Sequence, residues 1–109
     1  MIRIEFTGKA GKDATLKQID SKTSVTKFSI AVNESYKDKE GKKVEKTKWI
    51  ECEIWNRPKL QPHILKGHSF YINGNPDVKA FTPKDSTEAK GTLVCRVDEI
   101  EFLTPKKEV

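Results

Sequence analysis

The stretch Trp49–Trp55, with the sequence WIECEIW, decides the fold class of this chain. Its aliphatic and thiol side chains alternate with acidic and aromatic ones, and a period of two predicts a β-strand rather than a helix. Such a strand directs Ile50, Cys52 and Ile54 towards a core and both tryptophans towards the opposite, outer face. Large aromatic side chains on an outer face cost solubility, so the pair indicates a binding surface. A cover for the helix or a subunit interface is the alternative interpretation.

The same alternation recurs along the chain and predicts four further strands. These alternating segments are Ile2–Thr7, Thr26–Val32, Phe70–Ile72 and Leu93–Phe102. Turn residues occupy Gly8–Asp13, and the pattern Asp38-x-x-Gly41 is typical of a hairpin turn with Gly41 at a positive φ. The helix candidate is Pro58–Lys66. We expect a short helix that begins near Pro62, because proline is tolerated in the first turn of a helix and not in its interior.

Five strands with one short helix between the third and the fourth follow the order of an OB-fold barrel. We therefore predict an all-β protein, a five-stranded OB-fold barrel, with the OB-fold domain at residues 1–103 and a short polar tail at residues 104–109. A five-stranded barrel of the SH3 type is the structural alternative, and the position of the helix favours the OB-fold. OB-folds bind oligonucleotides on the face of strands 2 and 3 and with two long loops.

Composition excludes several classes of protein. The 109 residues have a formal net charge of +5, which is compatible with a nucleic-acid partner. No apolar run is long enough to cross a membrane, and the alternating N-terminus does not resemble a signal peptide. Cys52 and Cys95 lie far apart and the chain has only two histidines, so we expect buried free thiols, no metal and no cofactor. These features predict a cytoplasmic, nucleoid-associated protein. No carboxylate pairs recognisably with a nucleophile, so we expect no catalytic residue and no enzyme.

Aromatic and lysine side chains are interleaved in the chain. Tyr36 opens the hairpin between the second and third strands and Phe81 opens the loop after the fourth, so both are expected to extend the surface of Trp49 and Trp55. Rings stack on bases of any sequence and lysines neutralise phosphates, which favours a single-stranded nucleic acid as ligand. The candidate phosphate-binding residues are Lys12, Lys37, Lys42, Lys43, Lys48, Arg57 and Lys79. A solvated hairpin, diluted by acidic residues, is the alternative interpretation of the lysine run.

Several spaced motifs carry a family resemblance. They are Gly8–Asp13, Phe28–Tyr36, Thr47–Trp49, Trp55, Leu65–Ser69, Tyr71–Gly74 and Asp98–Leu103. Through them the chain resembles the bacterial single-stranded DNA-binding protein family over nearly its whole length. The resemblance implies that Tyr36, Trp49, Trp55 and Phe81 stack on bases, and that the chain forms a homotetramer, a dimer of dimers, in which the first strand contributes to dimer pairing. It also implies binding of single-stranded DNA without strong sequence preference, which protects the strand during DNA replication, recombination or repair.

Two other binding functions stay open. One is a primosomal-type OB protein, and the other is a protein-interaction OB module. Glu51 and Glu53 between the tryptophans support the module, because negative charge there opposes phosphate. Members of the resembled family have a long tail with an acidic tip, whereas this sequence ends with residues 105–109, PKKEV. We therefore expect no acidic-tip docking of this chain to replication enzymes.

Overall fold

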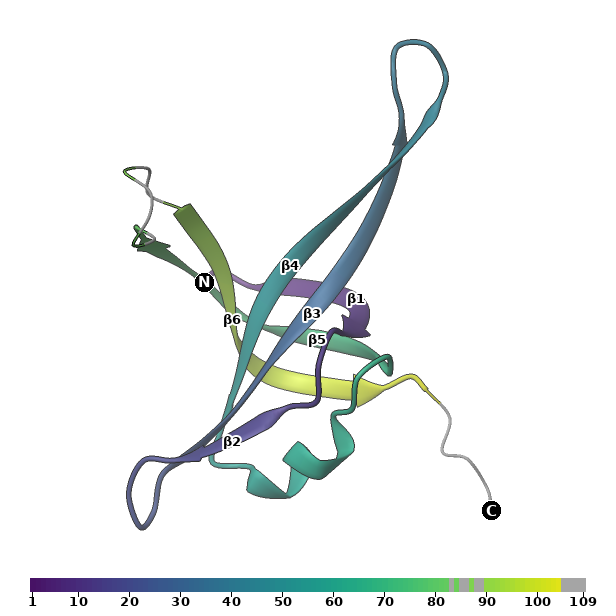
Figure 1. Ribbon diagram of the computed structural model, residues 1–109. Coiled ribbons are helices and arrows are strands. Elements are labelled where there is room, and N and C mark those ends of the chain that lie inside the picture. The colour runs from purple at the N-terminus through teal and green to yellow at the C-terminus, as the bar shows by residue number, and fades with distance from the viewer. Residues whose placement is uncertain (83, 85–86, 88–89, 105–109) are drawn as a thin grey trace.

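The computed structural model of the protein describes residues 1–82, 84, 87 and 90–104. This part of the chain contains six strands and one short helix (Figure 1). They are β1 (Ile4–Ala10), β2 (Thr15–Gln18), β3 (Ser24–Lys37), β4 (Lys43–Trp55), η1 (Pro58–His63), β5 (Ser69–Phe81) and β6 (Lys90–Phe102). The predicted all-β class, with a short helix after the strand that contains both tryptophans, is confirmed.

The strands close into a barrel. Their order in the sheet is β1-β5-β6-β4-β3-β2, and β1 also pairs with β3 at Lys9 and Ala10, which joins the two ends of the sheet. β4 and β6 run parallel, whereas the other pairs are antiparallel. Because β1 and β2 both pair with β3, they act as two parts of one bent strand, and the barrel has the five strands of the predicted OB-fold.

The first strand differs from its prediction. The turn predicted at Gly8–Asp13 is wrong for its first half, because β1 continues beyond Gly8, and the exposed β2 was not predicted. Gly8 allows β1 to cross β3 closely, since a Cβ there would lie 2.5 Å from the carbonyl oxygen of Ala31. The loop that follows is held by Asp13, whose carboxylate accepts a hydrogen bond from the backbone N–H of Lys66 at 2.8 Å.

The helix begins earlier than predicted. A start near Pro62 is wrong, because η1 is a 3-10 helix from Pro58 to His63 with Pro62 inside it. Each hydrogen bond of a 3-10 helix spans only three residues, so the missing N–H of Pro62 removes a single bond from this short segment. Ile64 caps the helix and is fully buried, which fixes η1 against the barrel.

The inner face of β4 is buried as the alternation predicts, with Ile50, Cys52 and Ile54 all in the core. Cys52 and Cys95 are register partners on β4 and β6, and both are free and buried, as predicted. Burial raises the pKa of the Cys95 thiol to about 11 and raises the pKa of the Cys52 thiol as well. Both thiols therefore stay protonated, and poorly nucleophilic, at neutral pH.

β3 and β4 extend beyond the barrel as a long two-stranded ribbon, whose tip stands at the opposite end of the molecule from η1 (Figure 1). We call residues 33–48 of this ribbon the arm. Its turn is the predicted one: Gly41 has a φ of 82°, and the Asp38 carboxylate accepts hydrogen bonds from the backbone N–H groups of Glu40 and Lys42, both at 2.9 Å. The sequence of the turn therefore determines the register of the arm.

Candidate nucleic-acid interface

The outer face of β4 holds the two tryptophans. Trp49 is 55% exposed, and Trp55 is half-buried. Glu51 and Glu53 lie between them on the same face, because side chains alternate along a strand. At about 3.4 Å per residue the two tryptophans are about 20 Å apart along β4. They therefore provide two separate contact points for a ligand.

The indole of Trp49 lies against the loop between β1 and β2. A Cβ at Gly11 would lie 2.6 Å from the indole Cζ3 and 2.8 Å from Cη2, so the ring takes this position because residue 11 has no side chain. Gly11, Lys12, Ser29 and Trp49 line an open pocket of about 170 Å³. The pocket offers a ring, a hydroxyl and an ammonium group, which suits a nucleotide base with its phosphate.

Trp55 has a cationic neighbour that the sequence analysis missed. Cζ of Arg96 lies 5.7 Å from the centroid of the Trp55 ring, within cation–π range. Arg96 is exposed on β6, between the buried Cys95 and Val97. That alternation marked Arg96 as an outward residue. Its place beside Trp55 follows only from the parallel pairing of β4 with β6, which no local pattern shows.

The carboxylates between the tryptophans both have partners. Oε1 of Glu53 lies 3.2 Å from Nζ of Lys79, and Glu51 accepts a hydrogen bond from Oγ of Ser29 at 3.0 Å. Lys79, a predicted phosphate-binding residue, is thus engaged in an ion pair. The Lys79 side chain is 61% exposed, so its ammonium group can be reached from solvent and an anionic ligand can compete for it.

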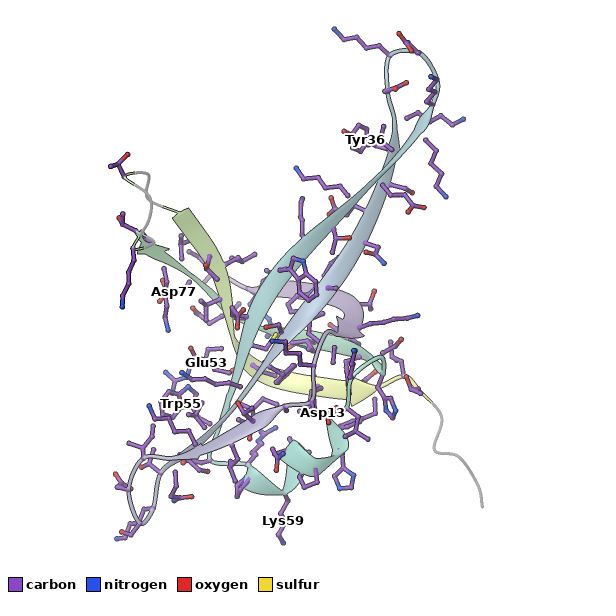
Figure 2. The ribbon with its side chains drawn as sticks, viewed as in Figure 1. Asp13, Tyr36, Glu53, Trp55, Lys59 and Asp77 are labelled. Carbon is purple, nitrogen blue, oxygen red and sulfur yellow. The ribbon has the colours of Figure 1, made fainter. Side chains whose placement is uncertain are left out.

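Tyr36 lies on the arm, where its side chain is 54% exposed (Figure 2). The register pairs Trp49 with Ala31, five residues before Tyr36 on the same strand. An odd separation places the two side chains on opposite faces of the ribbon. Alternation continues without a register shift along β3, so a ligand that reaches both rings must follow the twist of the arm. The stacking role of Tyr36 stays a prediction.

Cationic side chains follow the arm. Four predicted phosphate-binding residues lie on it, namely Lys37, Lys42, Lys43 and Lys48. Nζ of Lys48 lies 3.0 Å from Glu34 and Nζ of Lys43 lies 4.0 Å from Glu45. The two lysines and the two glutamates of these ion pairs are each more than half exposed. Both ion pairs are therefore weak and open to exchange with a phosphate.

The remaining predicted residues are spread over the molecule. Lys12 joins Trp49 at the pocket, whereas Arg57 caps η1 at the end opposite to the tip of the arm (Figure 1). The side chain of Phe81 lies outside the described residues, so its stacking role stays a prediction. Among the residues that the structure describes, no group of three or more His, Cys, Asp or Glu side chains is placed to hold a metal ion.

Comparison with known proteins identifies the family. Residues 1–103 match the Single-strand binding protein family. The chain belongs to this family. The mitochondrial single-stranded DNA-binding protein 1-B of Xenopus laevis is 29% identical over 119 residues, which cover 99% of this chain and 79% of the relative. The mitochondrial single-stranded DNA-binding protein of Oryctolagus cuniculus is 30% identical over 112 residues, which cover 94% of this chain and 74% of the relative.

Solved structures share the barrel of this single-strand binding family member. A Plasmodium falciparum SSB in complex with ssDNA superimposes with a TM-score of 0.77 at 21% identity, over 95% of this chain and 96% of that chain. A small single-stranded DNA-binding protein from Streptomyces coelicolor superimposes with a TM-score of 0.75 at 12% identity, over 93% of both chains. At these identities the likeness confirms the OB-fold.

The relatives compared above are named as mitochondrial proteins, so a cytoplasmic, nucleoid-associated location stays a prediction for this member of the single-strand binding family. In the part of the chain that the structure describes, no helix is long and apolar enough to cross a membrane.

Proposed function

We propose that this protein binds single-stranded DNA by stacking bases on Trp49 and Trp55 and by placing phosphates against the cationic side chains beside them. The observation that carries the proposal is the half-exposed indole of Trp49, held over Gly11 at the rim of a pocket that also contains Lys12. Membership of the single-strand binding protein family supports the same ligand. In this family the bound strand is an intermediate of DNA replication, recombination or repair, and we assign that role to this chain.

A single strand fits this surface better than a duplex does. In a duplex the bases stack on each other, so a ring on a protein surface has no free base to contact, whereas splayed bases stack on aromatic side chains at about 1–3 kcal/mol each. Stacking is tolerant of sequence, because every base has a π-face. We therefore expect little sequence preference and no catalysis.

The electrostatics of the surface support a polyanion as ligand. The chain has a formal net charge of +5, and the two carboxylates that favoured a protein-interaction module are held by Lys79 and Ser29. Because Lys79 offsets the charge of Glu53, that carboxylate opposes a phosphate less than a free one does. The lysines of the arm add charge that a phosphate backbone attracts by counterion release.

The proposal is tested by fluorescence anisotropy of a labelled oligo-dT, with unlabelled competitors added at one fixed salt concentration. Unlabelled oligo-dT should displace the probe, and a duplex of the same length should displace it far more weakly. Oligo-U is added as a third competitor, because single-stranded RNA also exposes bases that can stack on the rings. Equal displacement of the probe by the duplex and by the single strand would contradict the proposal that binding depends on base stacking.

The salt dependence of binding should locate the phosphates on the arm. Each phosphate neutralised on a single strand contributes a slope of about −0.7 to log K against log salt. Replacing Lys42 and Lys43 together with alanine should therefore flatten the slope by up to about 1.4. The matched control is the pair Lys59→Ala and Lys66→Ala, at the η1 end, which removes the same charge and should leave the slope almost unchanged. Equal effects of both pairs would show that only net charge matters.

We propose that the protein assembles as a homotetramer, a dimer of dimers, in which the free edge of β1 contributes to dimer pairing. One edge of β1 pairs with β5 from Ile4 to Lys9, while the pairs with β3 are limited to Lys9 and Ala10. An unpaired strand edge is a template for pairing with a second copy. Light scattering should give about four times the chain mass of 12.4 kDa. A single-chain mass at micromolar concentration would contradict this assembly.

A further inference from the structure

A cluster of charges surrounds Glu53 on the outer face of the barrel. Its register partners are Lys27 on β3 and Arg96 on β6, so a cationic residue lies beside it on each neighbouring strand. A third cation, Lys79, reaches it from β5, with Nζ 3.2 Å from Oε1. One carboxylate is thus placed among three cationic side chains that come from three other strands.

Glu53 is the enclosed member of this cluster. Its side chain is only 16% exposed, whereas Lys79 is 61% exposed, and Lys27 and Arg96 are also exposed. Figure 2 shows Glu53 on the barrel close to Trp55, well away from the tip of the arm. An anion that approaches from solvent therefore meets the cations first and the carboxylate behind them.

Arg96 connects the cluster to Trp55. Its Cζ lies 5.7 Å from the centroid of the Trp55 ring, and among the described residues it takes part in no ion pair within 4.0 Å. The contact with the ring holds the guanidinium near the aromatic surface while its N–H groups stay available to an oxygen ligand. A nucleotide whose base meets Trp55 would bring its phosphate to the same place.

From this geometry we propose that Lys27, Lys79 and Arg96 form a phosphate subsite beside Trp55, which the Glu53 carboxylate occupies in the free protein and a strand phosphate takes over on binding. The inference rests on the proposed function, since it names the group that this part of the surface takes. Glu53 acts as an internal competitor: it pairs with Nζ of Lys79 between the neighbouring Lys27 and Arg96, and it lowers the affinity for any strand that must displace it. The exchange is between two anions on the same cations, so no bond is made or broken.

The test is a double-mutant cycle on oligo-dT binding at low salt. Glu53→Gln keeps the shape of the side chain and removes the competing charge, so affinity should rise about two- to fivefold, as for an ion pair that solvent reaches from its lysine side. In a Lys79→Ala background the same change should gain less than half as much. The gain should also fade at high salt, where the attraction is screened. If Glu53→Gln raises the affinity as much in the Lys79→Ala background as in the parent, Glu53 acts only as a general negative charge, and the subsite is overturned.

Matched variants complete the experiment. Glu34→Gln removes the ion pair on the arm in which Nζ of Lys48 lies 3.0 Å from Glu34. Its effect on the affinity for oligo-dT should be the same with and without Lys79. Arg96→Ala should weaken oligo-dT binding about two- to fivefold, and Arg96→Lys should restore most of the loss. Affinity of Arg96→Ala equal to that of the parent would remove Arg96 from the subsite. The two proposals fail differently: a parent protein that does not bind oligo-dT overturns the proposed function, whereas a parent that binds with no response to Glu53→Gln overturns the subsite alone.

Discussion

Trp49→Ala should weaken binding of oligo-dT by about 1–3 kcal/mol, which corresponds to about 5- to 150-fold in Kd. The reason is geometric. Trp49 is 55% exposed, its indole lies where Gly11 has no side chain, and Lys12 lines the same pocket, so the ring is open to a base with its phosphate. Loss of the ring removes the stacking contact, while the charges of the neighbouring side chains stay.

The control for this loss is Trp49→Phe, which keeps an aromatic face and should keep most of the affinity. Thermal unfolding should separate binding from folding, because an exposed side chain adds little to the core and Trp49→Ala should leave Tm nearly unchanged. If Trp49→Ala binds oligo-dT as tightly as the parent at the same salt concentration, the indole is not a stacking surface.

Gly74→Ala should destabilise the barrel by about 3 kcal/mol. Gly74 lies at the irregularity in the register between β5 and β6, next to Asn73. A Cβ at Gly74 would overlap the carbonyl oxygen of Arg96, and would lie 2.9 Å from its carbonyl carbon and 3.0 Å from Cα of Val97. All three atoms belong to the backbone of the paired strand, so the clash cannot be relieved by moving a side chain.

The matched control is Gly91→Ala on the same pair of strands. There the nearest atom to an added Cβ is Cγ1 of Val78 at 4.0 Å, and the free energy of unfolding should change by no more than about 0.5 kcal/mol. Urea unfolding followed by circular dichroism measures both variants. Equal stabilities of the two variants would show that the β5–β6 pair can move apart at Gly74 without loss of stability.

Local patterns predicted the parts of the fold that depend on local physics. The alternation in Trp49–Trp55 separated the buried from the outer residues, because the pleat of a strand assigns faces without any tertiary contact. The turn at Asp38 and Gly41 was predictable for a similar reason, since a side-chain cap and a positive φ are determined within four residues. These two features positioned β4 and the arm correctly.

Features that depend on contacts between distant strands were missed. Alternation marked the fourth strand only at Phe70–Ile72, whereas β5 continues through Pro76 to Phe81, because the irregularity at Gly74 precedes the proline and β6 pairs with the strand from Phe70 to Phe81. Arg96 and Lys27 are far from Glu53 in sequence and become its neighbours only when β6 and β3 flank β4. The aromatic and basic composition of the surface was predictable, whereas the pairing of its charges was not.

The most direct measurement of the central claim is the intrinsic fluorescence of Trp49 during a titration with oligo-dT. The chain has two tryptophans, so Trp55→Phe leaves Trp49 as the single emitter. Stacking of a base on the indole should quench the emission in a saturable way, at the same concentrations at which anisotropy reports binding, and a duplex of equal length should quench far less. Binding of oligo-dT by anisotropy with no change in Trp49 emission would contradict the claim that the strand lies on the outer face of β4.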